Sequence, residues 1–162
     1  MKIIIYSDLH LEFGSGFKPP KDLDCDLVIL AGDICVLNNL ERLDQLLRNW
    51  SVPILYITGN HEYYTRRPMA QDEEKLKEWL SENHPHAKLL LNEAVSIGGI
   101  NFFGGTMWTN FNGADPQSME IARSNMNDFR LIRTNDDELL KPADTVILHQ
   151  EFVEKLKNWF EN

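Results

Sequence analysis

The sequence predicts an α/β protein with a central parallel sheet, built as one domain over residues 1–162. Three apolar runs rich in β-branched residues, 2–8, 26–33 and 53–60, have the length and composition of strands buried on both faces. A helical pattern lies between the second and third runs, and this order predicts parallel strands joined by a right-handed crossover. A chain of 162 residues is long enough to bury a core of its own.

The helices are predicted from the spacing of large apolar residues. In 38–50 such residues recur every three or four positions, at Leu40, Leu43, Leu46, Leu47 and Trp50, which predicts a helix with one buried face. The segment 69–83 has the same character, and the acidic residues near its start suit the positive end of a helix dipole. Two further helices are expected over 114–129, where Pro116 lies near the start, and over 145–162, which carries an apolar stripe.

Between these helices, residues 87–108 are expected to form short strands. The tetrapeptide "IGGI" at 97–100 predicts a hairpin turn, because two adjacent glycines accept the positive φ angles that tight hairpins require.

Composition limits the classes of function. The 25 acidic and 16 basic residues give a net charge of −9, which disfavours nucleic acid as a partner because phosphate neutralisation needs clustered basic side chains. No apolar run reaches the roughly 18 residues of a membrane span, so no membrane association is expected, and "MKIIIYSDLH" is read as a first strand. Cys25 and Cys35 are expected to be small buried hydrophobes of a cytoplasmic protein, since two cysteines make no disulfide framework.

Polar residues follow each of the three predicted strands. The first strand ends in Asp8 and His10, the second in Asp33, and the third in Asn60 and His61. In an open α/β sheet, ligands bind beyond the carboxyl ends of the parallel strands. Neighbouring strands would therefore bring these side chains to one edge.

These residue types suit a metal site. Carboxylate, imidazole and amide donors together favour ions such as Mn, Fe or Zn. Asp8 and His10 share one face if the backbone is extended there, and Asp33 could bridge two ions, which clamp a phosphate when about 3.5–4 Å apart. Each residue alone has another explanation as a turn, a helix cap or a surface histidine, but three such endings in succession favour a site.

The motifs "DLH" (8–10), "GD" (32–33) and "GNHE" (59–62) resemble the first three motifs of calcineurin-like metallophosphoesterases. The segments "FFGGTMWTNF" (102–111) and "MNDFRLI" (126–132) are similar to the middle of bacterial and phage-type members. The resemblance implies a β-sandwich flanked by helices, with two divalent ions (Mn, Fe, Zn or Ni) at the strand ends. It also implies hydrolysis of a phosphomonoester or phosphodiester by a metal-bound hydroxide.

Residue by residue, the resemblance assigns Asp8 and His10 to the first metal, Asp33 to both metals as a bridge, and Asn60 to the second. His61 matches a catalytic histidine that orients the phosphate and can protonate the leaving group. Glu62 is expected to support these residues and not to bind metal.

The sequence also departs from the family pattern. The family completes its site with a later histidine, often in "THH", and with "GHxH"; neither occurs here. His84 and His86 are expected in a polar surface loop, and His149 in a helix. A C-terminally incomplete sandwich is therefore expected, with one metal ion or none, weak activity, and exposed apolar surface for a second copy or a missing segment. The alternative function is a non-catalytic remnant, or a metal- or phosphate-binding module that associates with a partner.

Residues beyond the three motifs are left out of the predicted catalytic set. Arg66 and Arg67 are expected in a solvated basic turn, Trp108 either in the cleft or in the core, and Asp128 in a local ion pair with Arg130. The expected substrate is a phosphorylated small molecule or peptide, because the acidic balance argues against nucleic acid.

Overall fold

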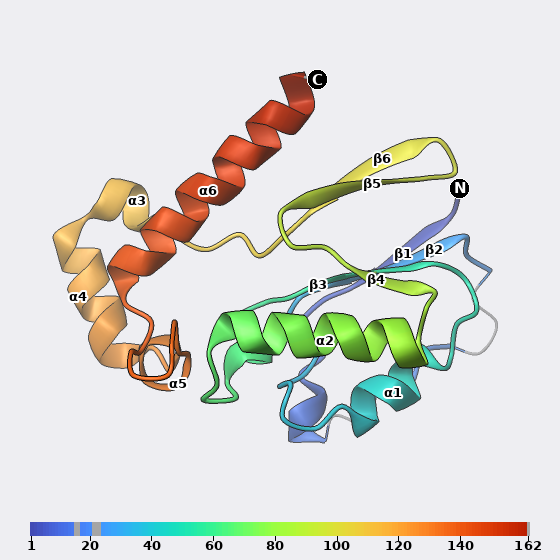
Figure 1. Ribbon diagram of the computed structural model, residues 1–162, viewed down its shortest axis with the longest axis horizontal. Helices are drawn as coiled ribbons and strands as arrows, with labels where there is room; N and C mark the ends of the chain where they lie inside the picture. Colours follow the sequence, from blue (N-terminus) through green and yellow to red (C-terminus); the bar gives the residue numbers. More distant parts are fainter. Residues whose placement is uncertain (15–16, 21–23, 162) are drawn as a thin grey trace.

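A parallel four-stranded sheet forms the centre of the computed structural model, which describes residues 1–14, 17–20 and 24–161 (Figure 1). The strand order is β1–β2–β3–β4, with bounds Ile3–Tyr6, Leu27–Ala31, Ile54–Ile57 and Ala87–Leu89. All three pairings are parallel. The predicted α/β architecture with a parallel sheet is confirmed.

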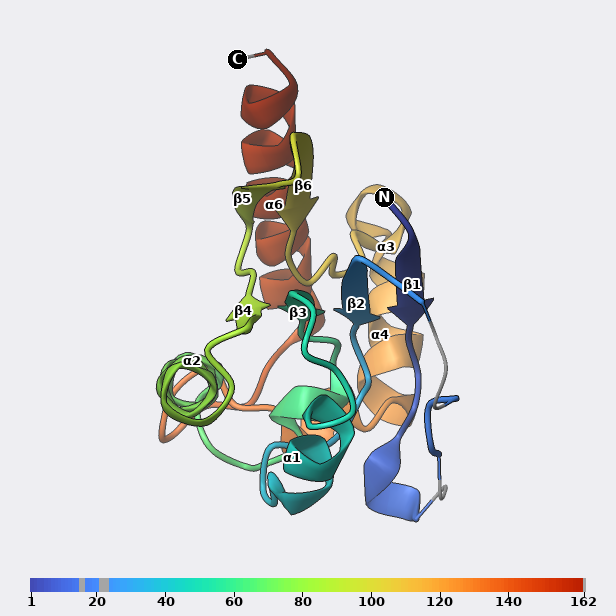
Figure 2. The same cartoon turned by 90° about the vertical axis from the view of Figure 1, so that its right-hand side faces the viewer.

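One face of the sheet is covered by helices α1 (Glu41–Leu47) and α2 (Met69–Asn83) (Figures 1 and 2). The core on this side joins alternate strand residues to the apolar faces of both helices: Val28, Leu30, Ile54, Tyr56, Leu43, Leu46, Leu47, Leu76 and Leu80. Each fully buried large apolar side chain stabilises the fold by about 1.5–3 kcal/mol. The leucine spacing that predicted helices thus also marks the buried faces.

The other face of the sheet is covered in part by the antiparallel hairpin of β5 (Glu93–Ile97) and β6 (Ile100–Gly104) (Figure 2). The predicted "IGGI" turn is confirmed, with Gly98 and Gly99 at φ 58° and 78°. Leu27, Leu55 and Leu90 form a second core with apolar hairpin residues. The second layer of the expected sandwich is therefore a two-stranded hairpin.

This hairpin leaves the β1 side of the same face open. Ile3 and Ile5 lie in register with Leu27 and Ile29 of β2, and so point to that face. These two residues are 38% and 63% exposed, although Leu27 is fully buried. Exposed apolar surface was expected, and β1 contributes part of it.

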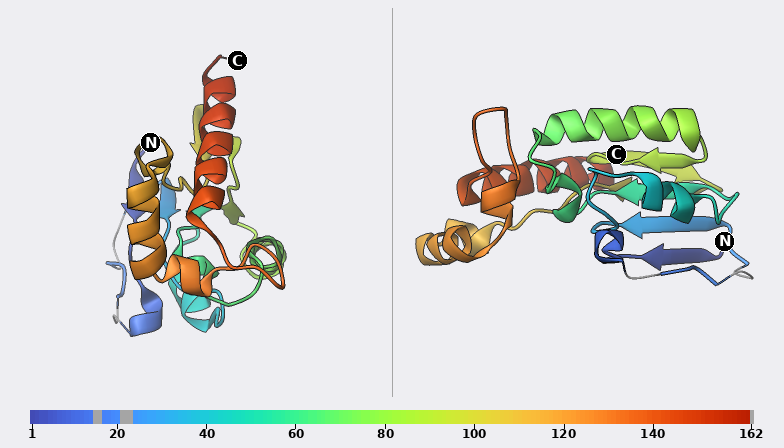
Figure 3. Two further views of the ribbon diagram at one scale, coloured as in Figure 1. Left: turned by 90° about the vertical axis from the view of Figure 1, so that its left-hand side faces the viewer. Right: turned by 90° about the horizontal axis from the view of Figure 1, so that it is seen from below.

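The remaining helices lie beyond the carboxyl ends of the parallel strands (Figures 1 and 3). They are α3 (Phe111–Ala114), α4 (Pro116–Asn125), α5 (Asp128–Leu131) and α6 (Pro142–Glu161). The single helix expected over 114–129 is interrupted because Met126 is extended, at φ −89° and ψ 141°. The helix expected from 145 begins earlier, at Pro142. None of the helices in the described ranges is long and apolar enough to cross a membrane.

Helix α6 is held to the hairpin by aromatic contacts. Phe103 of β6 lies with its ring centre 5.6 Å from that of Phe152 and 5.6 Å from that of Trp159. Part of the apolar stripe predicted on this helix thus packs against the hairpin, while Phe160 is 74% exposed. Of the two cysteines, Cys35 is buried and Cys25 partly buried, and neither forms a disulfide.

Candidate metal centre

The turns after β1 and β2 have an unusual backbone. Asp8, His10 and Asp33 all adopt left-handed conformations, with φ of 54°, 45° and 54°. This region costs most L-residues roughly 1–2 kcal/mol, although Asp, Asn and His tolerate it best. The extended backbone assumed for Asp8 and His10 is therefore wrong.

These two turns are bonded to each other. The Asp8 N–H donates to the Gly32 carbonyl at 3.1 Å, and the His10 N–H donates to the Asp33 carbonyl at 3.0 Å. The ladder between β1 and β2 thus continues into the loops that carry the predicted ligands. Backbone strain maintained by surrounding hydrogen bonds is typical of functional sites.

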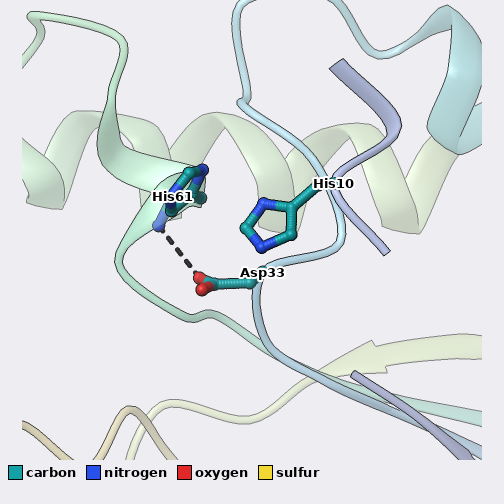
Figure 4. A group of neighbouring side chains, drawn as sticks. All are labelled: His10, Asp33 and His61. Carbon is teal, nitrogen blue, oxygen red and sulfur yellow. Dashed lines mark hydrogen bonds between the residues drawn. The ribbon is translucent and has the colours of Figure 1, made fainter. Parts of the chain in front are cut away.

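Three side chains, one each from the loops after β1, β2 and β3, converge. His10, Asp33 and His61 each offer a ligand atom, and these atoms all lie within 4.8 Å of one another (Figure 4). The His61 backbone N–H donates to Asp33 Oδ1 at 3.0 Å. Two imidazoles and one carboxylate suit a divalent transition metal, so the donor set fits such an ion.

A cavity of about 560 Å³ opens beside this group, beyond the carboxyl ends of the central strands. Among the predicted residues, Asp8, Asp33 and Asn60 line it. Asp33 therefore belongs both to the histidine group and to the cavity, as a bridging carboxylate would. Asp8 lies outside the 4.8 Å group, whereas His61, expected only as a catalytic residue, lies within it.

Glu62 joins the loop after β2 to the loop after β3. Its side chain is fully buried, and it accepts hydrogen bonds of 2.8–3.0 Å from the backbone N–H groups of Asp33, Ile34 and Gly59 and from the Tyr56 hydroxyl. Burial raises the pKa of Glu62, and the donated hydrogen bonds offset part of this effect. The structure matches the expectation that Glu62 supports the neighbouring residues.

Gly59 is required for the position of Asp33. A Cβ atom at residue 59 would lie 2.1 Å from Asp33 Oδ1 and 2.6 Å from the Asp33 backbone nitrogen. Only glycine lets the carboxylate approach this closely, which gives the "GN" of the third motif a structural reason.

Glu12 contacts both imidazoles, a role that the sequence reading missed. Its Oε1 lies 2.9 Å from Nδ1 of His61 and 3.3 Å from Nδ1 of His10. A carboxylate that accepts from Nδ1 leaves Nε2 of the ring for a cation, which is the usual arrangement around metal-bound histidines. The position of Glu12 two residues after His10 in "DLHLE" was the available signal.

The surroundings of Glu12 fit this role. Partial burial raises the pKa of Glu12, but the hydrogen bonds with His61, its own backbone and His10 outweigh burial and lower it overall. Its Oε2 is buried and has no hydrogen-bond partner among the residues that the structure describes.

Asp128 also reaches the site, contrary to prediction. Its Oδ1 accepts a hydrogen bond from Asn60 Nδ2 at 2.6 Å, and it lines the cavity. Arg130 instead bonds the Ser124 carbonyl, so the predicted local ion pair is wrong. A contact across 68 residues leaves no pattern in a single sequence.

The other histidines are engaged elsewhere. His84 is only 3% exposed, and its Nε2 pairs with Asp44 Oδ1 at 2.9 Å, so the predicted surface loop is wrong for this residue. His149 lies in α6 as expected, with Nδ1 2.7 Å from the Trp108 carbonyl. Neither belongs to the metal-sized group.

Arg67 and Trp108 lie near the site but differ in their contacts. Arg67 is not a solvated turn residue, because its guanidinium bonds the buried Asp72 carboxylate and the Leu37 carbonyl. Trp108 both lines the cavity and stacks on Tyr63, with ring centres 6.2 Å apart, so the cleft and core readings both hold.

Comparison with known proteins agrees with the site. A family model described as the calcineurin-like phosphoesterase superfamily domain matches residues 1–103, which carry all three motifs. The chain is also 29% identical, over its full length, to the uncharacterized protein L509 of Acanthamoeba polyphaga mimivirus, and spans 64% of that protein. The chain belongs to the calcineurin-like phosphoesterase superfamily.

Proposed function

We propose that the chain is a metal-dependent phosphoesterase whose cation ligands are Asp8, His10, Asp33 and Asn60. The observation that carries the proposal is the convergence of His10, Asp33 and His61 within 4.8 Å, from three loops far apart in sequence. We infer two cation positions, although the sequence led us to expect at most one, because Asp33 belongs both to the histidine group and to the cavity that Asp8 and Asn60 line. Manganese is the first ion to test.

The roles of the residues follow from their chemistry. Divalent cations, when bound, supply the positive charge that holds a phosphate group and activates water as a nucleophile. His61, whose Nδ1 contacts Glu12, can donate Nε2–H to the phosphate ester when its ring is the imidazolium, in which both nitrogens carry a proton. The cavity beside Asp33 gives the ester room at the strand ends.

The substrate class is a phosphomonoester or phosphodiester on a small molecule or peptide. With a net charge of −9, the protein repels polyanions, so nucleic acid is disfavoured. We expect slow turnover, because the later histidine motifs of the family are absent from the 162 residues and His84 and His149 make other contacts.

The test is hydrolysis of p-nitrophenyl phosphate and its bis-ester with added Mn²⁺. The expected result is slow release of nitrophenol that falls at least about 100-fold in Asp33→Asn and in His61→Gln, a typical loss for a positioned catalytic group. The exposed Asp137→Asn changes the charge equally and should retain wild-type rates. Equal rates in Asp33→Asn and wild type would contradict the assignment.

A second candidate function is binding of metal and phosphate without turnover. It is favoured by the donor count, since only two histidines of the described chain lie in the metal-sized group. Under this reading wild type binds Mn²⁺ and inorganic phosphate but releases no nitrophenol above the metal-only rate. Turnover as fast as that of a family member with all its histidines would exclude it.

A further inference from the structure

We propose that Asp128 is a positioning residue that fixes the side-chain amide of Asn60 with its oxygen toward the cavity. The inference rests on the proposed function, in which this oxygen binds a cation. Asp128 lies outside residues 1–103, the region that the family model matches.

A closed set of hydrogen bonds joins Asn60, Tyr64 and Asp128. Asn60 Nδ2 donates to Asp128 Oδ1 at 2.6 Å and to the Tyr64 hydroxyl at 3.0 Å. The Tyr64 hydroxyl donates in turn to the same Asp128 oxygen, at 2.8 Å. Asp128 is the common acceptor, and this residue is only 4% exposed.

The direction of these bonds determines the orientation of the amide. An ionised carboxylate only accepts hydrogen bonds, so it selects the NH2 end of the amide. Both N–H bonds of Asn60 Nδ2 are then used, one by Asp128 and one by Tyr64. The amide oxygen is left for the cavity that Asn60 lines together with Asp8 and Asp33. A flipped amide would present N–H groups to the cation and place its oxygen against the Asp128 carboxylate oxygen, with no hydrogen between the two acceptors.

Asp128 is anchored in place by the segment that follows it. Phe129 and Ile132 are buried in a cluster that includes Tyr63 of the third motif. The backbone N–H of Met69 donates to the Arg133 carbonyl at 3.0 Å, which ties this segment to the start of α2. The carboxylate is therefore held against Asn60 by a packed element, although the two residues are 68 positions apart.

The test measures Mn²⁺ binding by Asp128→Asn. Calorimetry gives the number of ions and their affinities, and electron paramagnetic resonance reports whether two bound ions are coupled. An asparagine at 128 has the same shape but can donate, so the Asn60 amide is free to flip. Wild type should bind two ions and show the signal of a spin-coupled pair. In Asp128→Asn we expect the affinity of the second ion to fall 10–100-fold, the range known for residues that orient metal ligands, and the coupled signal to disappear.

Three further variants distinguish a loss of Asn60 orientation from a general loss of folding. Tyr64→Phe keeps the ring that lies 4.4 Å from His61 but removes one bond to the amide, so a smaller loss is expected. Asp128→Glu retains an acceptor and should recover part of the affinity, and Asp137→Asn should bind as wild type does. Tyr64→Phe tests the inference even if Asp128→Asn fails to fold.

The outcomes are distinct. Two ions bound equally tightly by wild type, Asp128→Asn and Tyr64→Phe would overturn this inference and leave the proposed function standing. A wild-type protein that binds fewer than two Mn²⁺ ions would overturn the two-cation proposal, and this inference with it.

Discussion

At the scale of single residues, two carboxylates hold the groups around the candidate metal centre in position. Glu62 accepts from backbone N–H groups of the second and third loops, and Glu12 accepts from two imidazoles. Neither contributes to the predicted ligand set; each instead fixes groups that do. The precision of the site therefore depends on residues outside the predicted ligand set.

Glu12 can be tested without disturbing the fold. In Glu12→Gln the side chain keeps its shape but loses its charge, and it no longer holds both Nδ1–H groups equally well. We expect Mn²⁺ affinity to fall 10–100-fold, measured by calorimetry at fixed pH. Glu154→Gln, on the exposed side of α6, is the matched control and should bind as wild type does. Unchanged affinity in Glu12→Gln would remove Glu12 from the site.

Gly59 gives a second prediction at this scale. In Gly59→Ala the new methyl group meets the Asp33 carboxylate at 2.1 Å, so either the carboxylate or the loop must move. We expect a loss of about 1–3 kcal/mol in the free energy of unfolding, as overpacking usually costs, together with weaker Mn²⁺ binding. Gly99→Ala, at φ 78° with nothing nearby, should destabilise the hairpin and leave metal binding intact. Normal binding by Gly59→Ala would show that Asp33 needs no such room.

At the scale of elements, a buried histidine links two helices. His84, at the end of α2, pairs with Asp44 of α1 at 2.9 Å. Asp44 also accepts a hydrogen bond at 2.8 Å from the guanidinium of Arg48, the residue that follows α1. The hydrogen bond from Arg48 lowers the pKa of Asp44 and outweighs the opposing effect of burial, with a further lowering from His84.

This link predicts a pH-dependent contribution to stability. A carboxyl group whose pKa is lower in the folded state stabilises the fold above its unfolded pKa, about 3.9 for Asp, and loses this effect as pH falls through the folded value. We expect Asp44→Ala to lower the free energy of unfolding at pH 7 by about 1–3 kcal/mol, because the buried His84 side chain loses its hydrogen-bond partner. The gap from wild type should narrow below about pH 4.

Urea unfolding at pH 7 and pH 3 measures this difference. Asp137→Ala, which alters an exposed carboxylate, should stay within about 0.5 kcal/mol of wild type at both values. A gap that is the same at pH 7 and pH 3 would show that the charge of Asp44 is not involved.

At the scale of the whole molecule, local patterns predicted the elements and the edge that carries the site. The bounds of α2 match the sequence prediction, because its apolar spacing and its packing face agree. The convergence of His10, Asp33 and His61 also followed from strand order alone. In a parallel sheet the ends of neighbouring strands meet at one edge, so three motifs far apart in sequence become neighbours. The order of the strands could be predicted from the alternation of strand and helix patterns along the sequence.

What escaped prediction depends on contacts that no local pattern encodes. Asp128 meets Asn60 only because α5 packs against Tyr63. His84 is buried because α1 places Asp44 beside it. The left-handed turns at Asp8 and His10 arise from their bonds to the next loop, which a reading of the first strand by itself does not contain.

Those left-handed turns decide how the ligands should be mutated. Alanine at residue 8, 10 or 33 would remove a ligand and also place a residue that disfavours φ near 50° at a strained turn. An alanine scan would then mix folding defects with lost chemistry. Asparagine accepts this backbone conformation more readily and lacks both the carboxylate charge and the imidazole nitrogen. Asp8→Asn, His10→Asn and Asp33→Asn therefore report on cation binding with the loops left in place.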